Sequence, residues 1–172
     1  PSFDYTDEEW NDLISYFQQK DNLDLTYEDP HNFTLNSSSF KAGERIAEMG
    51  ACINCHFYGA EKPKQDALTW APNLVLTKER LRPEWLVEWF INPQDVMPGT
   101  KMPAPYIPTE EPQNSIREVW GSDVAKISRD STKLYKSLID WMWGMEGRKD
   151  VSSIVKRHLN SQGYGFIIEE ED

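Results

Sequence analysis

The sequence is poor in cysteine, in positive charge and in long apolar runs, and each shortage excludes a class of protein. Two cysteines among 172 residues cannot build a disulfide framework or a four-thiolate zinc site. Lys and Arg number 18 against 29 Asp and Glu, and the net charge of −11 argues against nucleic-acid binding and against docking on anionic lipid. No run approaches the roughly 18–20 apolar residues of a membrane span, so the sequence predicts no intrinsic span.

Aromatic residues are abundant by contrast. Apolar residues make up 38 % of the chain, yet Trp, Tyr and Phe contribute seven each. So few aliphatic side chains beside so many rings predict a small core that is completed by something other than side chains.

Apolar residues recur at helical spacing and no strand pattern appears, so the predicted fold class is all-α with long loops. Thr6 and Glu9 form a capping box at the start of a first helix. Gly43 lies inside a second helix, where glycine costs about 1 kcal/mol relative to alanine, so we expect a close helix crossing there. The segment 93–112 holds six prolines and is expected to be a stiff extended strap rather than a regular helix, and 113–130 has little signal. The predicted helices cover residues 1–20, 36–49, 83–91, 131–145 and 151–159.

Both cysteines belong to a C-x-x-C-H motif that ends at His56. Because Cys52 and Cys55 lie three apart, each thiol can add to one vinyl group of a single haem while the following histidine coordinates the iron. A thioredoxin-like redox pair is a second hypothesis, but it needs a βαβ context that this sequence lacks. A zinc site is a third, and it needs further ligands. The other histidines, His31 and His158, lie in polar segments and are expected to be ordinary surface side chains.

The segment 92–102 reads N-P-Q-D-V-M-P-G-T-K-M and resembles the N-P-x-x-x-x-P-G-T-K-M segment of class I cytochromes c. The resemblance covers about residues 36–145 and implies a cytochrome c fold, with three to four core helices around one covalently bound haem c. It implies that His56 is the proximal iron ligand and that Met102 is the distal one, and a thioether ligand favours ferrous iron. Met97 takes the position before the strap proline, where the family has a residue that packs along the haem crevice.

Two further expectations follow from the same resemblance. The segment 71–74, A-P-N-L, resembles the family's G-P-x-L turn, in which the proline carbonyl accepts a hydrogen bond from Nδ1 of the proximal histidine. Pro72 is assigned that role. The family's usual tryptophan partner of a haem propionate has no counterpart here, and Arg82 or Trp70 is expected to replace it.

A bound porphyrin would also account for the unusual composition. Its apolar surface contributes about 25 cal/mol for each Å² that is buried, so it could replace missing aliphatic core. We therefore expect the haem-free chain to be largely unfolded. The side chains expected to cover the haem are Phe57, Tyr58, Trp70, Leu74, Trp85, Trp89 and Tyr106.

These observations predict three segments. Residues 1–35 form an N-terminal helix and linker, 36–145 the cytochrome c domain, and 146–172 an acidic C-terminal extension, for which a solvated, partly disordered tail is the simplest expectation. The opening of the chain resembles the way class I cytochrome c domains end. One hypothesis is therefore that the first segment is the tail of a preceding haem domain in a longer multihaem chain; the other is a helical extension packed on the haem domain.

With His56 and Met102 both on the iron, the expected function is one-electron transfer and not catalysis. The acidity favours redox partners with a basic docking face, such as an oxidase, a reductase or a quinol-oxidising complex, and a fast, salt-dependent association. A subunit or domain of a membrane-associated complex is as well supported as a free shuttle. The family resemblance implies a periplasmic or otherwise extracytoplasmic location. The alternative is a haem peroxidase or gas-sensing domain whose distal ligand is displaced.

Overall fold

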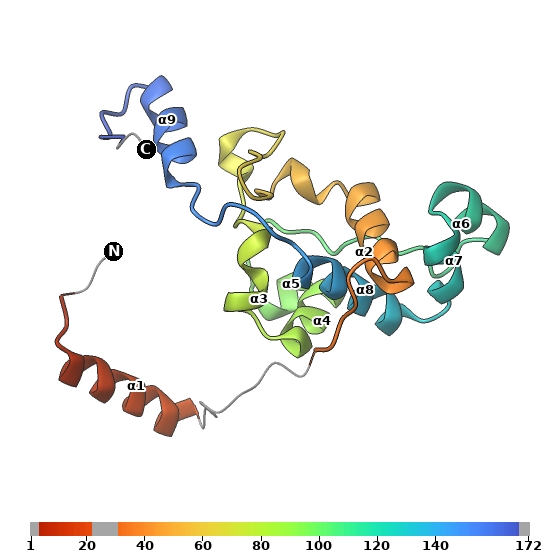
Figure 1. The fold of residues 1–172 in the computed structure, drawn as a ribbon, viewed down its shortest axis with the longest axis horizontal. Coiled ribbons are helices and arrows are strands. Elements are labelled where there is room, and N and C mark those ends of the chain that lie inside the picture. Colours follow the sequence, from red (N-terminus) through yellow and green to blue (C-terminus); the bar gives the residue numbers. More distant parts are fainter. Residues whose placement is uncertain (1–3, 22–30, 169–172) are drawn as a thin grey trace. The chain divides into compact units, whose positions relative to one another are not determined.

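The computed structural model describes residues 4–21 and 31–168 (Figure 1). The chain divides into two compact units, Pro1–Pro30 and His31–Asp172. The described residues are helical, with turns and extended segments, and their only β pairings are two isolated bridges. The prediction of an all-α protein is therefore confirmed. None of the described helices is both long enough and apolar enough to cross a membrane.

The first unit contains α1 (Asp7–Asp21), and its start has the predicted capping box. The Thr6 backbone N–H donates to Glu9 Oε2 at 2.8 Å, and the Glu9 backbone N–H donates to Thr6 Oγ1 at 3.3 Å. The apolar residues that recur at helical spacing along this helix are largely exposed in the structure, with Trp10, Ile14 and Phe17 each 40–44 % accessible.

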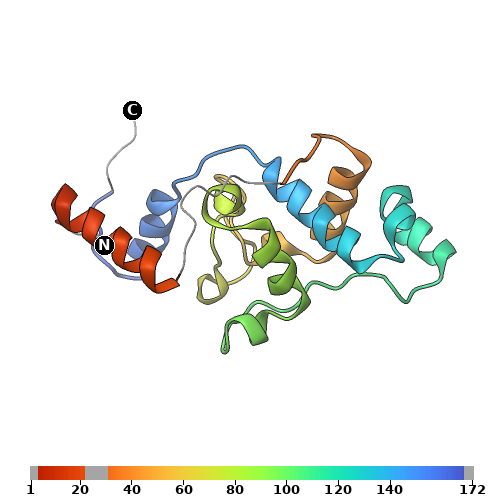
Figure 2. The same cartoon turned by 90° about the horizontal axis from the view of Figure 1, so that it is seen from below.

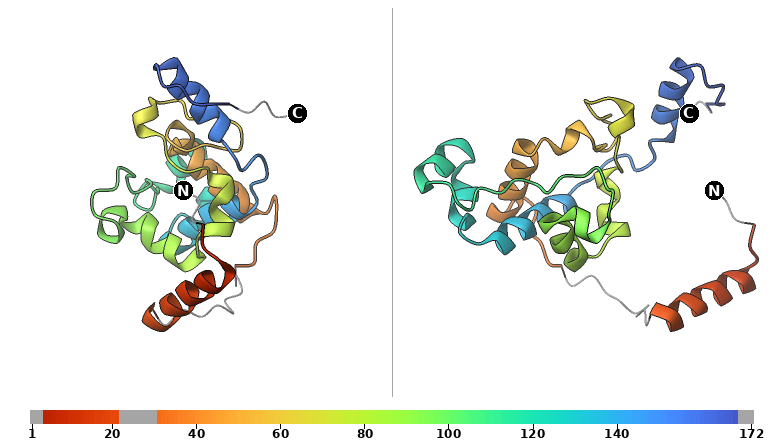
Figure 3. Two further views of the ribbon diagram at one scale, coloured as in Figure 1. Left: turned by 90° about the vertical axis from the view of Figure 1, so that its left-hand side faces the viewer. Right: turned by 180° about the vertical axis from the view of Figure 1, so that it is seen from behind.

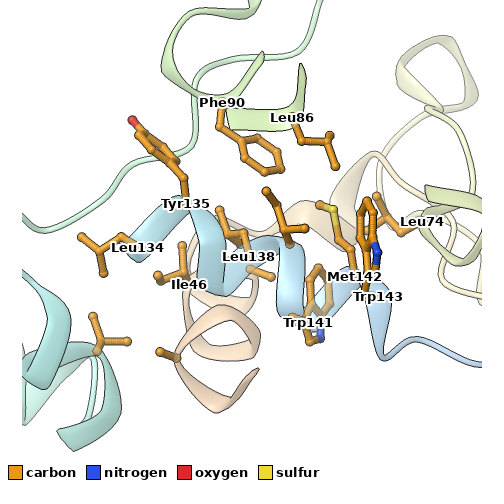
Figure 4. Close-up of a cluster of buried hydrophobic side chains, with 14 of the residues drawn as sticks. Ile46, Leu74, Leu86, Phe90, Leu134, Tyr135, Leu138, Trp141, Met142 and Trp143 are labelled. Atoms are coloured by element: carbon orange, nitrogen blue, oxygen red, sulfur yellow. The ribbon is translucent and has the colours of Figure 1, made fainter. Parts of the chain in front are cut away.

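The core of the second unit is built on the crossing of α2 (Ser38–Met49) with α8 (Ser131–Trp143). At Gly43 the two backbones touch, because a Cβ built there would lie 1.8 Å from the carbonyl oxygen of Ser137. The close crossing predicted from this glycine is confirmed. Figure 4 shows side chains of α8 reaching Ile46 of α2 on one side and Phe90 on the other.

Two short helices precede the methionine-containing segment. α4 (Pro83–Ile91) begins and ends where the sequence predicts, with proline at its first turn and Asn92 as its C-cap. The sequence predicts that the following segment, 93–112, is extended. The structure differs at its start, where α5 (Pro93–Val96) forms one helical turn. Proline is tolerated at the first position of a helix, where its missing N–H has no partner to lose.

The segment 113–130 forms a helical hairpin, which the sequence analysis did not predict. α6 (Gln113–Val119) and α7 (Ser122–Ile127) are joined at Gly121, whose φ of +90° suits glycine. Figures 1 and 2 show this hairpin beside α2, and the Ser38 hydroxyl donates to Asp123 of α7. Ile116 and Val124 are fully buried, so the hairpin extends the core.

The chain beyond α8 continues through an extended segment to α9 (Ser152–Ser161), where the sequence predicted a short amphipathic helix (Figure 3). One further helical turn, α3 (Thr77–Arg80), precedes α4. The expectation that His31 is an ordinary surface residue is wrong, because its side chain is only 12 % exposed and is paired at 2.6 Å with Asp140. His158 is half-buried, and its ring lies 4.8 Å from that of Trp70.

Candidate functional site

The C-x-x-C-H motif forms a tight turn directly after α2. Ala51 reverses the chain with a φ of +52°, and the 3₁₀ helix η1 (Cys52–Asn54) follows. The carbonyl of Cys52 accepts the backbone N–H groups of both Cys55 and His56, at 3.2 and 2.9 Å. Both cysteines are free thiols with half-buried side chains. The turn therefore holds two thiols and an imidazole within five residues.

Burial raises the pKa of the Cys52 thiol to about 11, and the neighbouring Cys55 adds to that rise. The side chain is therefore a thiol and not a thiolate at neutral pH. No group of three or more His, Cys, Asp or Glu side chains in the described parts of the chain is arranged to hold a metal ion.

The loop that contains Pro72 holds the His56 ring in place. Its Nδ1 lies 2.8 Å from the carbonyl oxygen of Pro72, the contact expected from the A-P-N-L turn. The Ala71 backbone N–H donates to the carbonyl of Cys55 at 2.7 Å, and His56 and Ala71 form a parallel bridge. The loop is thus joined to the motif by its backbone as well as by the histidine ring.

This contact determines the tautomer of His56. A carbonyl can only accept, so Nδ1 carries the proton and Nε2 keeps its lone pair in the neutral ring. Burial lowers the pKa of His56, and the Pro72 hydrogen bond opposes that effect. The ring is therefore neutral at neutral pH and presents Nε2 as a potential ligand atom.

Met102 lies in the middle of the proline-rich segment 93–112, with its thioether half-buried beside α4. The indole N–H of Trp89 donates to Met102 Sδ at 2.8 Å, and the Trp89 ring stacks on Trp85 with centroids 5.0 Å apart. The Met102 backbone N–H donates to the Thr100 hydroxyl at 3.3 Å. The sequence predicts Trp89 among the side chains at the site, but it carries no sign that Trp89 donates to the sulfur.

The methionine segment also contacts the loop that follows the C-x-x-C-H motif. Lys101, the residue before Met102, donates from Nζ to the carbonyl of Leu68 at 3.3 Å. Leu68 belongs to the 3₁₀ helix η2 (Ala67–Thr69), which precedes the Pro72 turn. A hydrogen bond therefore joins the methionine segment to the loop that contains Pro72.

Other predicted residues lie differently from expectation. The indole N–H of Trp70 donates to the carbonyl of Gln65 at 3.1 Å and so is already used, which argues against its expected contact with a propionate. Tyr106 is 59 % exposed, lies against Trp120 and donates to Glu111. Met97 is 55 % exposed instead of packed, and Arg82 is an exposed residue at the N-cap of α4.

Asn73 is a second residue that the sequence analysis missed. It follows Pro72, is 5 % exposed, and hydrogen bonds through its side-chain amide to three separate segments of the chain. Its bond to Val75 is a local N-cap, but no local pattern indicates the contacts with Arg148 and Lys149, which lie up to 76 positions away.

Comparison of the chain with models of known protein families, with curated proteins and with solved structures finds no match in any of the three. The function is therefore argued from the geometry of the site and from the residues themselves.

The residues present fit a covalently attached haem. Two free thiols precede a histidine whose Nδ1 is hydrogen bonded to a carbonyl and whose Nε2 remains available. A thioether sulfur has two lone pairs, so Met102 can accept the Trp89 N–H and still bind a metal. The half-buried rings of Tyr58, Trp85 and Trp89 pack against the core cluster and offer an apolar surface.

Proposed function

We propose that this chain is a c-type cytochrome that transfers single electrons. The observation that carries the proposal is the hydrogen bond from His56 Nδ1 to the Pro72 carbonyl, made by the histidine of a C-x-x-C-H motif. It fixes the ring in the tautomer that an iron ligand requires, and it is the backbone contact that orients ligating histidines in many metal proteins.

In this proposal Cys52 and Cys55 would hold one haem c by thioether bonds, and His56 and Met102 would be the two protein ligands of its iron. The bound haem supplies an iron that accepts and releases one electron. The chain's own residues do the rest. Pro72 holds the proton on Nδ1 of His56, and Trp89 holds the Met102 sulfur in place through its N–H.

Two protein ligands leave no iron position for a substrate, which supports electron transfer over catalysis. Trp89 strengthens this argument, because its hydrogen bond opposes displacement of the Met102 side chain. A peroxidase or gas-sensing domain needs that side chain to leave. We infer that the all-α fold is a cytochrome c fold, in which α2 and α8 are two of the core helices that the resemblance implies.

The charge of the chain is distributed unevenly, which sharpens the proposed partner. Residues 1–30 hold nine acidic residues and one lysine, and 169–172 are all acidic. Residues 31–168 hold 16 acidic and 17 basic residues, a net charge of +1. Attraction to a basic redox partner, such as an oxidase, a reductase or a quinol-oxidising complex, would therefore come from the two ends of the chain. We propose an extracytoplasmic location, where haem c is attached.

The test is the absorption spectrum of the protein produced in cells that attach haem c. A covalent haem, retained after denaturation and acidic extraction, is the expected result for Cys52 and Cys55. A ferric protein with a near-infrared sulfur-to-iron band identifies Met102 as the ligand. A high-spin spectrum would instead support the peroxidase or sensor hypothesis, and no Soret band would reject haem.

A further inference from the structure

The side chain of Asn73 forms a clamp that joins the Pro72 loop to the segment after α8. Its Oδ1 accepts the backbone N–H groups of Gly59 and Val75, at 3.1 and 3.3 Å. Its Nδ2 donates to the carbonyls of Arg148 and Lys149, at 2.9 and 3.1 Å. A buried amide with every polar atom satisfied holds its partners firmly, because a lost contact leaves a buried polar group unpaired.

The segment that Asn73 contacts also lies against the chain just after the C-x-x-C-H motif. A Cβ built on Gly147 would lie 3.6 Å from the Gly59 Cα, which is van der Waals contact. Both glycines have positive φ, +144° and +60°, which other residues adopt only with strain. The path of the backbone after α8 across the loop therefore depends on these two glycines.

A second contact joins the same part of the chain to this loop farther along. The His158 ring of α9 lies 4.8 Å from the ring of Trp70, which also contacts Phe57 edge to face at 5.2 Å. The Trp70 N–H donates to the carbonyl of Gln65, whose own backbone N–H donates to Asn54 in the motif. Residues 147–158, here called the C-terminal strap, therefore contact the loop on both sides of Pro72 in sequence.

We propose that the C-terminal strap, acting through Asn73, sets the position of the Pro72 carbonyl against His56 Nδ1 and so tunes the reduction potential of the protein. This inference rests on the proposed function. Asn73 is a positioning residue, since it is adjacent to Pro72 and its amide is held by Arg148 and Lys149. A shorter bond from Nδ1 to the carbonyl makes the imidazole a stronger donor and stabilises ferric iron. Loosening the clamp therefore favours the ferrous state.

The role also corrects the expectation for residues 146–172. The described part of that extension is not merely a solvated tail, because its backbone carbonyls complete a buried hydrogen-bond network at the candidate site. A partner that pulled on the strap would change the potential without touching either iron ligand.

The experiment uses two variants of the full, haem-loaded chain, each with a matched control. Asn73→Asp removes the donors to Arg148 and Lys149 and sets a carboxylate against their carbonyls. Its control is Asn160→Asp, whose amide clamps Phe166 in the same manner, outside the strap.

Gly147→Ala strains the strap at a φ of +144° and leaves Asn73 intact. Its control is Gly163→Ala, which introduces similar strain at a φ of +95° in open space. For all four variants we measure the midpoint potential, the near-infrared band, and the solvent exchange of the His56 Nδ1 proton by NMR.

Gly147→Ala is expected to raise the ferrous-to-ferric ratio several-fold at the parent's midpoint potential. The carboxylate of Asn73→Asp itself stabilises ferric iron, so for that variant the proton exchange and the near-infrared band are the decisive measurements, and both variants share one expectation for them. Both variants should speed exchange of the His56 Nδ1 proton and keep the near-infrared band, while both controls match the parent. If Asn73→Asp does not fold, Gly147→Ala decides. Parent-like potential and exchange in Gly147→Ala overturn the proposal, and so does loss of its near-infrared band, because the effect would then involve Met102. A parent without covalent haem refutes the proposed function itself.

Discussion

Replacing Gly43 by alanine sets two effects of opposite sign against each other. Alanine favours a helix interior over glycine by about 1 kcal/mol, so propensity alone predicts that Gly43→Ala stabilises the protein. The added Cβ would meet the carbonyl oxygen of Ser137 at 1.8 Å and the backbone N of Leu138 at 2.9 Å. Both obstacles are backbone atoms of α8, which cannot move aside as a flexible side chain can.

The cost follows from how far the helices must separate. To restore a contact of 3.0 Å, α2 and α8 must move apart by about 1.2 Å. Ile46 and Leu138, each 1 % exposed, pack at this crossing and would lose contacts. Overpacking costs about 3 kcal/mol at the upper end of its usual range, so the net destabilisation is about 2 kcal/mol after the propensity gain. For a chain of this size, that corresponds to a melting temperature lower by roughly 4–8 °C.

The assay is thermal unfolding of the haem-loaded protein, followed by circular dichroism at 222 nm and by the Soret band. Lys41→Ala, an exposed substitution on the same helix, is the control and should change stability by less than about 0.5 kcal/mol. A Gly43→Ala protein that is as stable as the parent, or more stable, would refute the close crossing as the structure has it.

Three further predictions concern the ligands and the helix caps. Met102→Ala should abolish the near-infrared band and lower the potential, whereas Met97→Ala should leave the band intact; the reverse would mean that Met97 is the ligand. Trp89→Phe should keep the band but lower the potential in a redox titration, because the N–H no longer draws electron density from the sulfur; an unchanged potential would refute that role. Asp130 caps α8, and the N–H of Lys133 lowers its carboxyl pKa below the usual 3.8. The stabilising effect of the Asp130 cap should be complete above pH 3.8 and lost as the pH falls through the lower pKa of the folded state. In denaturant titrations, the loss of unfolding free energy in Asp130→Ala relative to the parent should therefore vanish in acid. A loss that persists in acid contradicts the assignment.

The helices that the sequence predicts well are those whose first turn carries a capping residue or a proline. Thr6 and Glu9 mark the start of α1, and Pro83 marks the start of α4. Each signal acts within one turn of the residue that carries it, so it can be recognised without knowledge of the fold.

The α6–α7 hairpin was missed because its apolar residues are few and are interrupted. Ile116, Trp120 and Val124 recur at intervals of four, but Gly121 breaks the run. Propensity is a weak signal for such short helices, and burial against the rest of the core stabilises them. That burial is visible only when the whole chain is folded.

The difference between local signals and long-range packing also separates the contacts in and around the candidate site. The Pro72 contact of His56 joins residues 16 apart and was predicted from a motif resemblance. The pairing of His31 with Asp140 spans 109 residues, and the Asn73 clamp spans up to 76. Contacts of that length depend on how helices and loops pack, so sequence spacing carried no signal for them.

The central claim is that Cys52, Cys55, His56 and Met102 hold a single six-coordinate haem. The most direct test is the spectrum of the purified ferric and ferrous protein, with denaturation and acidic extraction to show covalent attachment. The account predicts one haem per chain that remains attached, a low-spin c-type ferrous spectrum, and a sulfur-to-iron band in the near infrared for the ferric form. A protein without a Soret band, or with a high-spin ferric spectrum lacking the near-infrared band, would contradict it.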